Sequence, residues 1–473
     1  MNSFKAGCCK HSLRMVSSFT GSRQVPTEWL RRVTEDQSEP PRLYAWRLTN
    51  LADGANYARK SLEVGEEIPN SDDERHRIYI LGVGNIGRLY ASFLAKNNPR
   101  PPITLVVHRR ELLDQWNARP GIELVRDDGR IERNPAFRIE WWTDAQPAHG
   151  PVREPGSGCG ISNLIIATKA PDAIPQVDRA RRYLGGGSTV AFAQNGMCKL
   201  WPPLGEAYVA ARFGKGGGPR WLACVTTHGV TSLEPFRSVH ASPADVRVGS
   251  VMVRGGDGWD GNGNGNGNDG DKDQDDYLAE QIVGAPGLAA RRVATRELWV
   301  AQLEKLVVNA VINPLTAVLR CKNGEVFEER GDGLGDVVEM LVEEASRTLR
   351  ALVGHRSSEG ILRAQDDAVI GAAGEKSLER TREELLERFS SVRLRTMLYS
   401  VGEKVAANTS SMLQDVQAGK KTEIEDFNGW LVETARYLGD EGLPVNEKLI
   451  SLVEDGAVRT RGELVKELRD SRG

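Results

Sequence analysis

Three polar side chains, Lys305, Asn309 and Asn313, recur every four residues in the otherwise apolar run KLVVNAVINPLTAV. This spacing places them in one file along a single face of a helix. An unpaired buried amide costs about 1–3 kcal/mol and an unpaired charge costs more, so the file needs polar partners. An ammonium can donate a proton to a developing oxyanion, and amides can bind oxygen-rich ligands. The structural alternative is that Lys305 reaches solvent and the amides bond to neighbouring helices.

Within the same run, Pro314 lacks the N–H group that would bond to the carbonyl of Ala310. We therefore expect a kink at this point of the helix.

A glycine-rich loop in ILGVGNIGRLY has GxGxxG spacing. The motif is meaningful only between a strand and a helix, and the runs RIYIL and IGRLYASFLAKN on either side meet that condition. The first glycine permits a tight turn, the second a close approach of pyrophosphate, and the third helix–strand packing. The alternative is a glycine-rich turn in an unrelated α/β protein. We predict a dinucleotide site formed by Gly82, Val83, Gly84, Asn85, Ile86 and Gly87.

The end of the second predicted strand carries His108, Arg109 and Arg110. An NAD site usually has an acidic residue there, whereas an arginine can pair with the 2′-phosphate of NADP. Arg109 therefore predicts NADP(H) as the cofactor, with a solvated basic turn as the alternative.

Two further strand-like runs end in polar residues, Lys169 after LIIAT and Asn195 after TVAFAQ. Ligands of doubly wound sheets bind outside the carboxyl ends of the strands, so both residues are candidates for binding. Each is also compatible with ordinary loop chemistry.

The composition excludes several classes of protein. A formal charge of −3 gives no net attraction for nucleic acid or membrane, and no apolar run approaches the length of a membrane span. The six cysteines are scattered, which predicts neither a disulfide framework nor a metal site. We expect a protein of a reducing compartment that is a monomer or homodimer and acts on a small molecule.

The length of 473 residues predicts more than one domain. Residues 1–75 are polar and are predicted to form an N-terminal extension and linker. Alternating strand-like and helix-compatible runs predict a parallel, doubly wound Rossmann domain in residues 76–293. Apolar stripes with i, i+3, i+4 spacing predict an all-helical domain in residues 294–473.

Two segments lack the apolar residues of a core. Residues 1–27 hold four cations, several serines and no acidic residue, so they resemble a mitochondrial transit peptide, with a disordered cytoplasmic N-terminus as the alternative. Residues 255–276 are rich in Gly, Asn and Asp and are predicted to be a disordered insertion. The acidic spacing there is similar to that of an EF-hand, but Gln274 occupies the position that needs glycine.

Six motifs in order, GVGNIG, ATKAPDA, QNGM, VTTHGV, KLVVNAVINPLTAV and SSMLQDVQAGKKTEIEDFNGWL, resemble the ketopantoate reductase (2-dehydropantoate 2-reductase) family. The resemblance covers about residues 77–455. It implies a Rossmann domain followed by a helical domain similar to that of 6-phosphogluconate dehydrogenase. It also implies reduction of 2-dehydropantoate to pantoate with NADPH, in the biosynthesis of pantothenate and coenzyme A.

The resemblance also assigns roles to residues. It implies that Lys305 and Glu423 are catalytic. It implies that substrate is bound by Asn195, Asn309, Asn313 and Ser411, and cofactor by the glycine loop, Arg109, Lys169 and Asn195. The chain departs from the family pattern at Cys198, which follows NGM where glycine is frequent.

Other interpretations stay open. The run TEIE is also a capping box, with Thr422 as the N-cap and Glu425 at N3, which would give Glu423 a place in a first helical turn. Ser411 is also compatible with a surface hydroxyl. The chain could reduce a different 2-keto acid, or bind NADP without catalysis as a scaffold or regulator.

Overall fold

The computed structural model describes residues 28–51, 71–202, 204–214, 218–251, 277–363 and 372–471. The insertion at 255–276 and the transit-like segment lie outside these residues. The chain divides into two compact units. The first contains most of the chain up to Val293. The second contains residues 294–473 together with the short segments 169–171 and 195–198.

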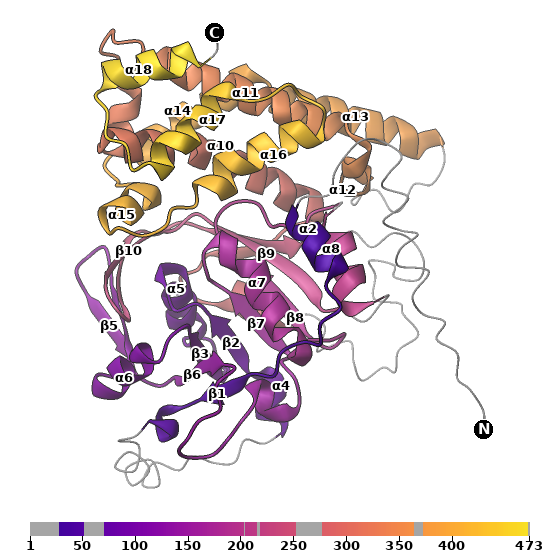
Figure 1. The fold of residues 1–473 in the computed structure, drawn as a ribbon, viewed down its shortest axis with the longest axis vertical. Coiled ribbons are helices and arrows are strands. Elements are labelled where there is room, and N and C mark those ends of the chain that lie inside the picture. The colour runs from indigo at the N-terminus through magenta and orange to yellow at the C-terminus, as the bar shows by residue number, and fades with distance from the viewer. Residues whose placement is uncertain are drawn as a thin grey trace. The chain divides into compact units, whose positions relative to one another are not determined.

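Within the described residues, a nine-stranded sheet organises the first unit (Figure 1). The strand order β6-β3-β2-β7-β8-β9 is parallel throughout and is that of a doubly wound Rossmann sheet. An antiparallel strand flanks it on each side, β1 beside β6 and β12 beside β9, and β13 pairs with β12. The strands are β1 (Tyr44–Trp46), β2 (Ile78–Leu81), β3 (Ile103–Val107), β6 (Arg138–Thr143), β7 (Asn163–Ile166), β8 (Thr189–Phe192), β9 (Arg220–Thr226), β12 (Val246–Ser250) and β13 (Ala290–Arg292).

The central strands β2, β3, β7 and β8 are buried at every position, as expected of parallel strands that are covered on both faces. Helices lie between them along the chain, so the predicted alternation of strands and helices is confirmed. The helices of this unit are α2 (Glu28–Glu35), α4 (Ser71–His76), α5 (Asn85–Leu94), α6 (Glu111–Ala118), α7 (Ala170–Ala180), α8 (Leu204–Phe213) and α9 (Tyr277–Gly284).

A second, four-stranded sheet in the same unit has the order β10-β11-β4-β5. Its strands are β4 (Ile122–Val125), β5 (Ile131–Asn134), β10 (Gly229–Glu234) and β11 (Arg237–Ser242). Alternating exposure along β5 shows why it escapes prediction, since only every second residue is partly covered. This sheet was not predicted from the sequence.

The N-terminal extension is partly folded, which corrects its prediction as extension and linker. Residues 36–46 run from α2 to the edge strand β1, where Ala45 pairs with Trp142 of β6. The strand has only three residues, which is too short for an apolar period to be recognised.

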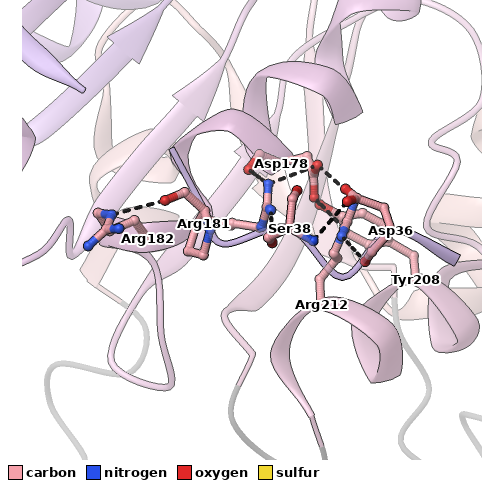
Figure 2. A network of polar contacts seen from close by, with 8 residues as sticks. Asp36, Ser38, Asp178, Arg181, Arg182, Tyr208 and Arg212 are labelled. Carbon is pink, nitrogen blue, oxygen red and sulfur yellow. Dashed lines mark hydrogen bonds and ion pairs between the residues drawn. The ribbon is translucent and has the colours of Figure 1, made fainter. Parts of the chain in front are cut away.

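A polar network fastens this segment to α7 and α8 (Figure 2). Arg212 of α8 forms ion pairs with Asp36 and with Asp178 of α7, each at 2.8 Å. Arg181 donates a hydrogen bond to the carbonyl of Ser38 at 3.0 Å. The Arg212 side chain is only 6% exposed, so both carboxylates compensate a cation that is largely removed from water.

The second unit is helical, as predicted (Figure 1). Its first helix, α10, continues through Pro314 to Leu319. The helices α13 and α14 are separated at Ser390, which caps α14 by accepting a hydrogen bond from the N–H of Arg393. The helices are α10 (Thr295–Leu319), α11 (Leu334–Gly354), α12 (Glu359–Arg363), α13 (Ala372–Arg388), α14 (Ser391–Lys404), α15 (Ser411–Gln417), the π-helix η7 (Glu425–Gly429), α16 (Trp430–Tyr437), α17 (Pro444–Glu454) and α18 (Arg461–Asp470).

In the ranges that the structure describes, every helix is too short or too polar to cross a bilayer.

Candidate active site

The side chain of Asn195 joins the two candidate catalytic residues of the helical unit. Lys305 on α10 donates from Nζ to Oδ1 of Asn195 at 3.0 Å. The other end of the amide donates from Nδ2 to Oε2 of Glu423 at 3.4 Å. One amide therefore bridges an ammonium and a carboxyl that lie far apart in the sequence.

Burial shifts the pKa values of both ionisable groups toward neutrality. It lowers the pKa of Lys305 to about 8, against the opposing effect of the negative charge on Glu423. Burial also raises the pKa of Glu423, against the opposing effects of the Ala170 N–H, the charge on Lys169 and the Asn195 amide. The Ala170 N–H donates to Oε1 of Glu423 at 3.0 Å. A lysine with a pKa near 8 can release and regain a proton under physiological conditions.

Lys169, predicted to bind cofactor, forms an ion pair with Asp415 of α15 at 2.8 Å and donates to the carbonyl of Lys421. The ammonium is thus held within the helical unit. Asp415 was not predicted as part of the site. Its position four residues after Ser411, one helical turn along α15, was the only signal in the sequence.

The polar file on α10 has partners of different kinds. Asn313 is 8% exposed and donates to Oγ of Ser411 at 3.5 Å, the upper limit for a hydrogen bond. A shorter contact of 2.7 Å between Oγ1 of Thr316 and Oγ of Ser410 holds the start of α15 against α10. The side chain of Asn309 makes no hydrogen bond to any residue of the described ranges and is half-buried. Its amide is therefore available to a ligand.

The predicted capping box at TEIE is not formed. The residue that caps the π-helix η7 is Ile424, without a side-chain hydrogen bond. Glu423 instead directs its carboxyl to Ala170 and Asn195, so its place before a helix start does not explain its orientation.

The glycine loop lies in the first unit, between β2 and α5, as predicted. Gly82 has φ +99°, and a Cβ there would lie 2.7 Å from the carbonyl carbon of Ala167. A Cβ on Gly87 would collide with the carbonyl oxygen of Gly82. A Cβ on Gly84 would meet nothing within 4 Å. Packing thus explains two glycines, while the open space at Gly84 beside the start of α5 fits a dinucleotide pyrophosphate.

The three other residues of the glycine loop make contacts within the first unit. The side chain of Asn85 is engaged within the protein, since Nδ2 donates to the carbonyl of Val230 at 3.1 Å. Only its backbone N–H remains for a phosphate. Val83 and Ile86 are partly buried against the core of the unit.

Arg109 is exposed directly after β3, at the carboxyl end of the strand. The guanidinium of its neighbour Arg110 lies 5.8 Å from the centre of the Trp46 ring.

A residue near the loop that sequence reasoning missed is Arg88. It is 4% exposed and donates to the carbonyls of Glu234 and Arg237, each at 2.7 Å, and to that of Gly84 at 3.1 Å. Burial lowers its pKa to about 10. Arg88 therefore connects the turn between β10 and β11 to the glycine loop through hydrogen bonds. No pattern in the sequence indicates this contact.

Known proteins match both the Rossmann part and the helical part of the chain. Residues 78–252 match the family described as ketopantoate reductase PanE/ApbA, and residues 297–456 match its C-terminal domain. The chain belongs to the ketopantoate reductase family. It is accordingly an oxidoreductase, and the resemblance stated from the motifs is confirmed.

Two proteins that are similar to this chain over most of its length are ketoisovalerate reductases. Ketoisovalerate reductase BEA2 of Gibberella fujikuroi is 42% identical over 445 residues, which cover 91% of this chain and 96% of that protein. Ketoisovalerate reductase of Beauveria bassiana is 39% identical over 458 residues, which cover 93% and 98%. The fold also matches the crystal structure of 2-dehydropantoate 2-reductase from Geobacter metallireducens, with a TM-score of 0.50, 18% identity and coverage of 80% and 100%.

Proposed function

We propose that this protein reduces a small branched 2-keto acid to the 2-hydroxy acid with a nicotinamide cofactor, and that 2-ketoisovalerate is its preferred substrate. The observation that carries the reaction type is the Lys305–Asn195–Glu423 bridge beside the free amide of Asn309. The substrate preference rests on the two ketoisovalerate reductases, which share about two fifths of their residues with this chain over more than nine tenths of its length.

The cofactor, when bound, supplies a hydride to C2 of the keto acid. The ketone oxygen gains negative charge as the hydride arrives. The ammonium of Lys305 stabilises this charge and gives its proton to the oxygen. Asn195 holds the ammonium in place through Oδ1, and Glu423 fixes the orientation of Asn195 by accepting from Nδ2.

The remaining amides suit the ends of the substrate. Asn309 has an unused amide that can donate to a carboxylate. Asn313 and Ser411 share only a long hydrogen bond, so a carboxylate oxygen of the substrate could replace their contact.

A second candidate substrate is 2-dehydropantoate, which the family is named for and which we predicted from the motifs. It differs from 2-ketoisovalerate by a hydroxymethyl group. A site built to bond that hydroxyl rejects the compound that lacks it by roughly 10⁴–10⁵-fold, whereas an apolar pocket discriminates only weakly.

The test is to measure kcat/KM for 2-ketoisovalerate and for 2-dehydropantoate with the same enzyme and cofactor. We expect the value for 2-ketoisovalerate to be higher. A higher value for 2-dehydropantoate would assign that substrate instead. If neither compound were reduced, the non-catalytic interpretation would replace this proposal.

A further inference from the structure

Pro314 leaves one carbonyl of α10 without its helical partner. In an uninterrupted helix, the carbonyl of Ala310 would accept from the N–H of residue 314, which proline lacks. The side chain of Asn428 supplies the missing donor, with Nδ2 at 2.8 Å from the Ala310 oxygen. This contact explains why α10 continues through a proline.

The donor belongs to a chain of buried polar groups. Nδ2 of Asn428 also donates to Oδ1 of Asn446 at 2.8 Å, and Nδ2 of Asn446 donates to Oε2 of Glu344 at 2.7 Å. All three side chains are at most 1% exposed. Because a carboxylate only accepts, Glu344 fixes the orientation of Asn446, which in turn makes Asn428 present its NH₂ group.

In this orientation of the Asn428 amide, its oxygen accepts no hydrogen bond from the described residues. Its Oδ1 is buried and has no hydrogen-bond partner among the described residues. The residue therefore leaves its acceptor unused while both of its donor hydrogens are engaged. The side chain at position 428 is thus oriented to donate a hydrogen bond to the Ala310 carbonyl.

The location of Asn428 links it to the candidate active site. It lies in the π-helix η7, in the same short segment as Glu423. Its acceptor, Ala310, directly follows Asn309 on α10. One hydrogen bond therefore connects the segment that holds Glu423 to the helix that carries Lys305.

We propose that Asn428 is a positioning residue for catalysis, which sets Lys305 and Asn309 against Glu423 by bonding the carbonyl that Pro314 leaves free. This inference rests on the proposed function. It predicts that the need for Asn428 depends on the proline, because alanine at position 314 restores an N–H donor for Ala310.

The test is a double-mutant cycle of Asn428→Ala and Pro314→Ala, read by kcat, the KM of each substrate and the melting temperature. With Pro314 present, Asn428→Ala should lower kcat about tenfold through misplacement of Lys305, and leave the KM for the cofactor unchanged. With alanine at position 314, the same substitution should lower kcat less than about threefold. A loss of equal size in both backgrounds would overturn the inference.

Asn50→Ala is the matched control, since it removes a buried amide that donates to the carbonyls of His149 and Pro151 and contacts neither Ala310 nor Asn428. This control should change kcat and the melting temperature by the same amount with proline and with alanine at position 314. If Pro314→Ala reduced the loss of kcat in the control as well, the inference would be contradicted. If Asn428→Ala does not fold, Asn428→Ser, which is too short to reach Ala310, takes its place in the cycle. An inactive wild type would overturn the proposed function and this inference together, whereas an active wild type without coupling overturns only the inference.

Discussion

Lys305 and Glu423 do not form a direct ion pair in this structure but share the two ends of the Asn195 amide. The carboxyl is close enough for its charge to raise the pKa of the lysine, while burial lowers that pKa to about 8. The arrangement leaves the ammonium acidic enough to donate a proton and keeps it in a fixed place.

The pH dependence of kcat should therefore reveal Lys305. The proton donor is the charged form, so activity is present below its pKa and is lost as the pH rises through about 8. Glu423→Gln removes the charge that raises this pKa, and the alkaline limb should move to lower pH. The measurement is kcat between pH 6 and 10 for both proteins, and a limb that stays in place would argue against the coupling.

Two glycines of the loop should respond differently to alanine. Gly84→Ala has room in the protein, so the melting temperature should change little while the KM for the cofactor rises about tenfold or more, because the methyl group takes the place of a phosphate. Gly87→Ala should lower the stability by several kcal/mol, since its Cβ meets the Gly82 carbonyl. Thermal unfolding and cofactor titration of the two variants distinguish these effects, and equal behaviour would contradict them.

Arg109 should select NADPH over NADH. Arg109→Ala should raise the KM for NADPH about tenfold or more and leave that for NADH unchanged, because only NADPH carries the 2′-phosphate. Arg110→Ala removes an adjacent exposed cation and serves as the control. A wild type that uses both cofactors equally well would show that Arg109 has no such role.

A buried histidine pair should make the first unit sensitive to acid. Nδ1 of His228 accepts from the N–H of Ala244, and its contact with Nε2 of His240 is 3.0 Å. Nε2 of His240 is thus the donor of that pair, and its buried Nδ1 has no hydrogen-bond partner among the described residues. Burial, with repulsion from His228 and Arg126, lowers the pKa of His240 to about 4.

Because the folded-state pKa lies below the ordinary value of 6.5, the neutral form stabilises the fold above pH 6.5, and this contribution is lost as the pH falls toward 4. His240→Gln keeps a donor but does not titrate. It should reduce the loss of unfolding free energy between pH 6.5 and 4 by about 1–2 kcal/mol, measured by urea denaturation. If the variant lost as much unfolding free energy as the wild type over this pH range, His240 would not be the cause of the loss.

The sequence predicted those parts of the molecule whose structure depends on residues that are close together in the chain. Gly82 and Gly87 owe their identity to a turn of a few residues, so spacing alone revealed the loop. The alternation of strands and helices in the first unit followed from the apolar runs, and the helical unit from its stripes. By contrast, Ile131 of β5 is 57% exposed at the edge of a small sheet, and a strand of this kind leaves no apolar pattern.

The candidate site depends on contacts between distant parts of the chain. Asn195 donates a hydrogen bond to Glu423, which lies 228 positions further along the chain. Lys169, which follows a different strand, forms an ion pair with Asp415. Without the family motifs, Glu423 would be taken for a carboxylate in the first turn of a helix capped by Thr422, and that cap is not formed. Asn428 and Ala310 lie 118 positions apart, so no local pattern indicates which donor replaces the one that Pro314 removes.

The central claim is that Lys305 donates the proton in reduction of a 2-keto acid, and Lys305→Met tests it most directly. Methionine keeps an unbranched stem on α10 and favours helix, so the melting temperature and the cofactor affinity should stay close to those of the wild type. With 2-ketoisovalerate, kcat should fall by roughly 10²–10⁴-fold, the usual contribution of a general acid. A variant that retains wild-type kcat would contradict the assignment of Lys305 as the proton donor.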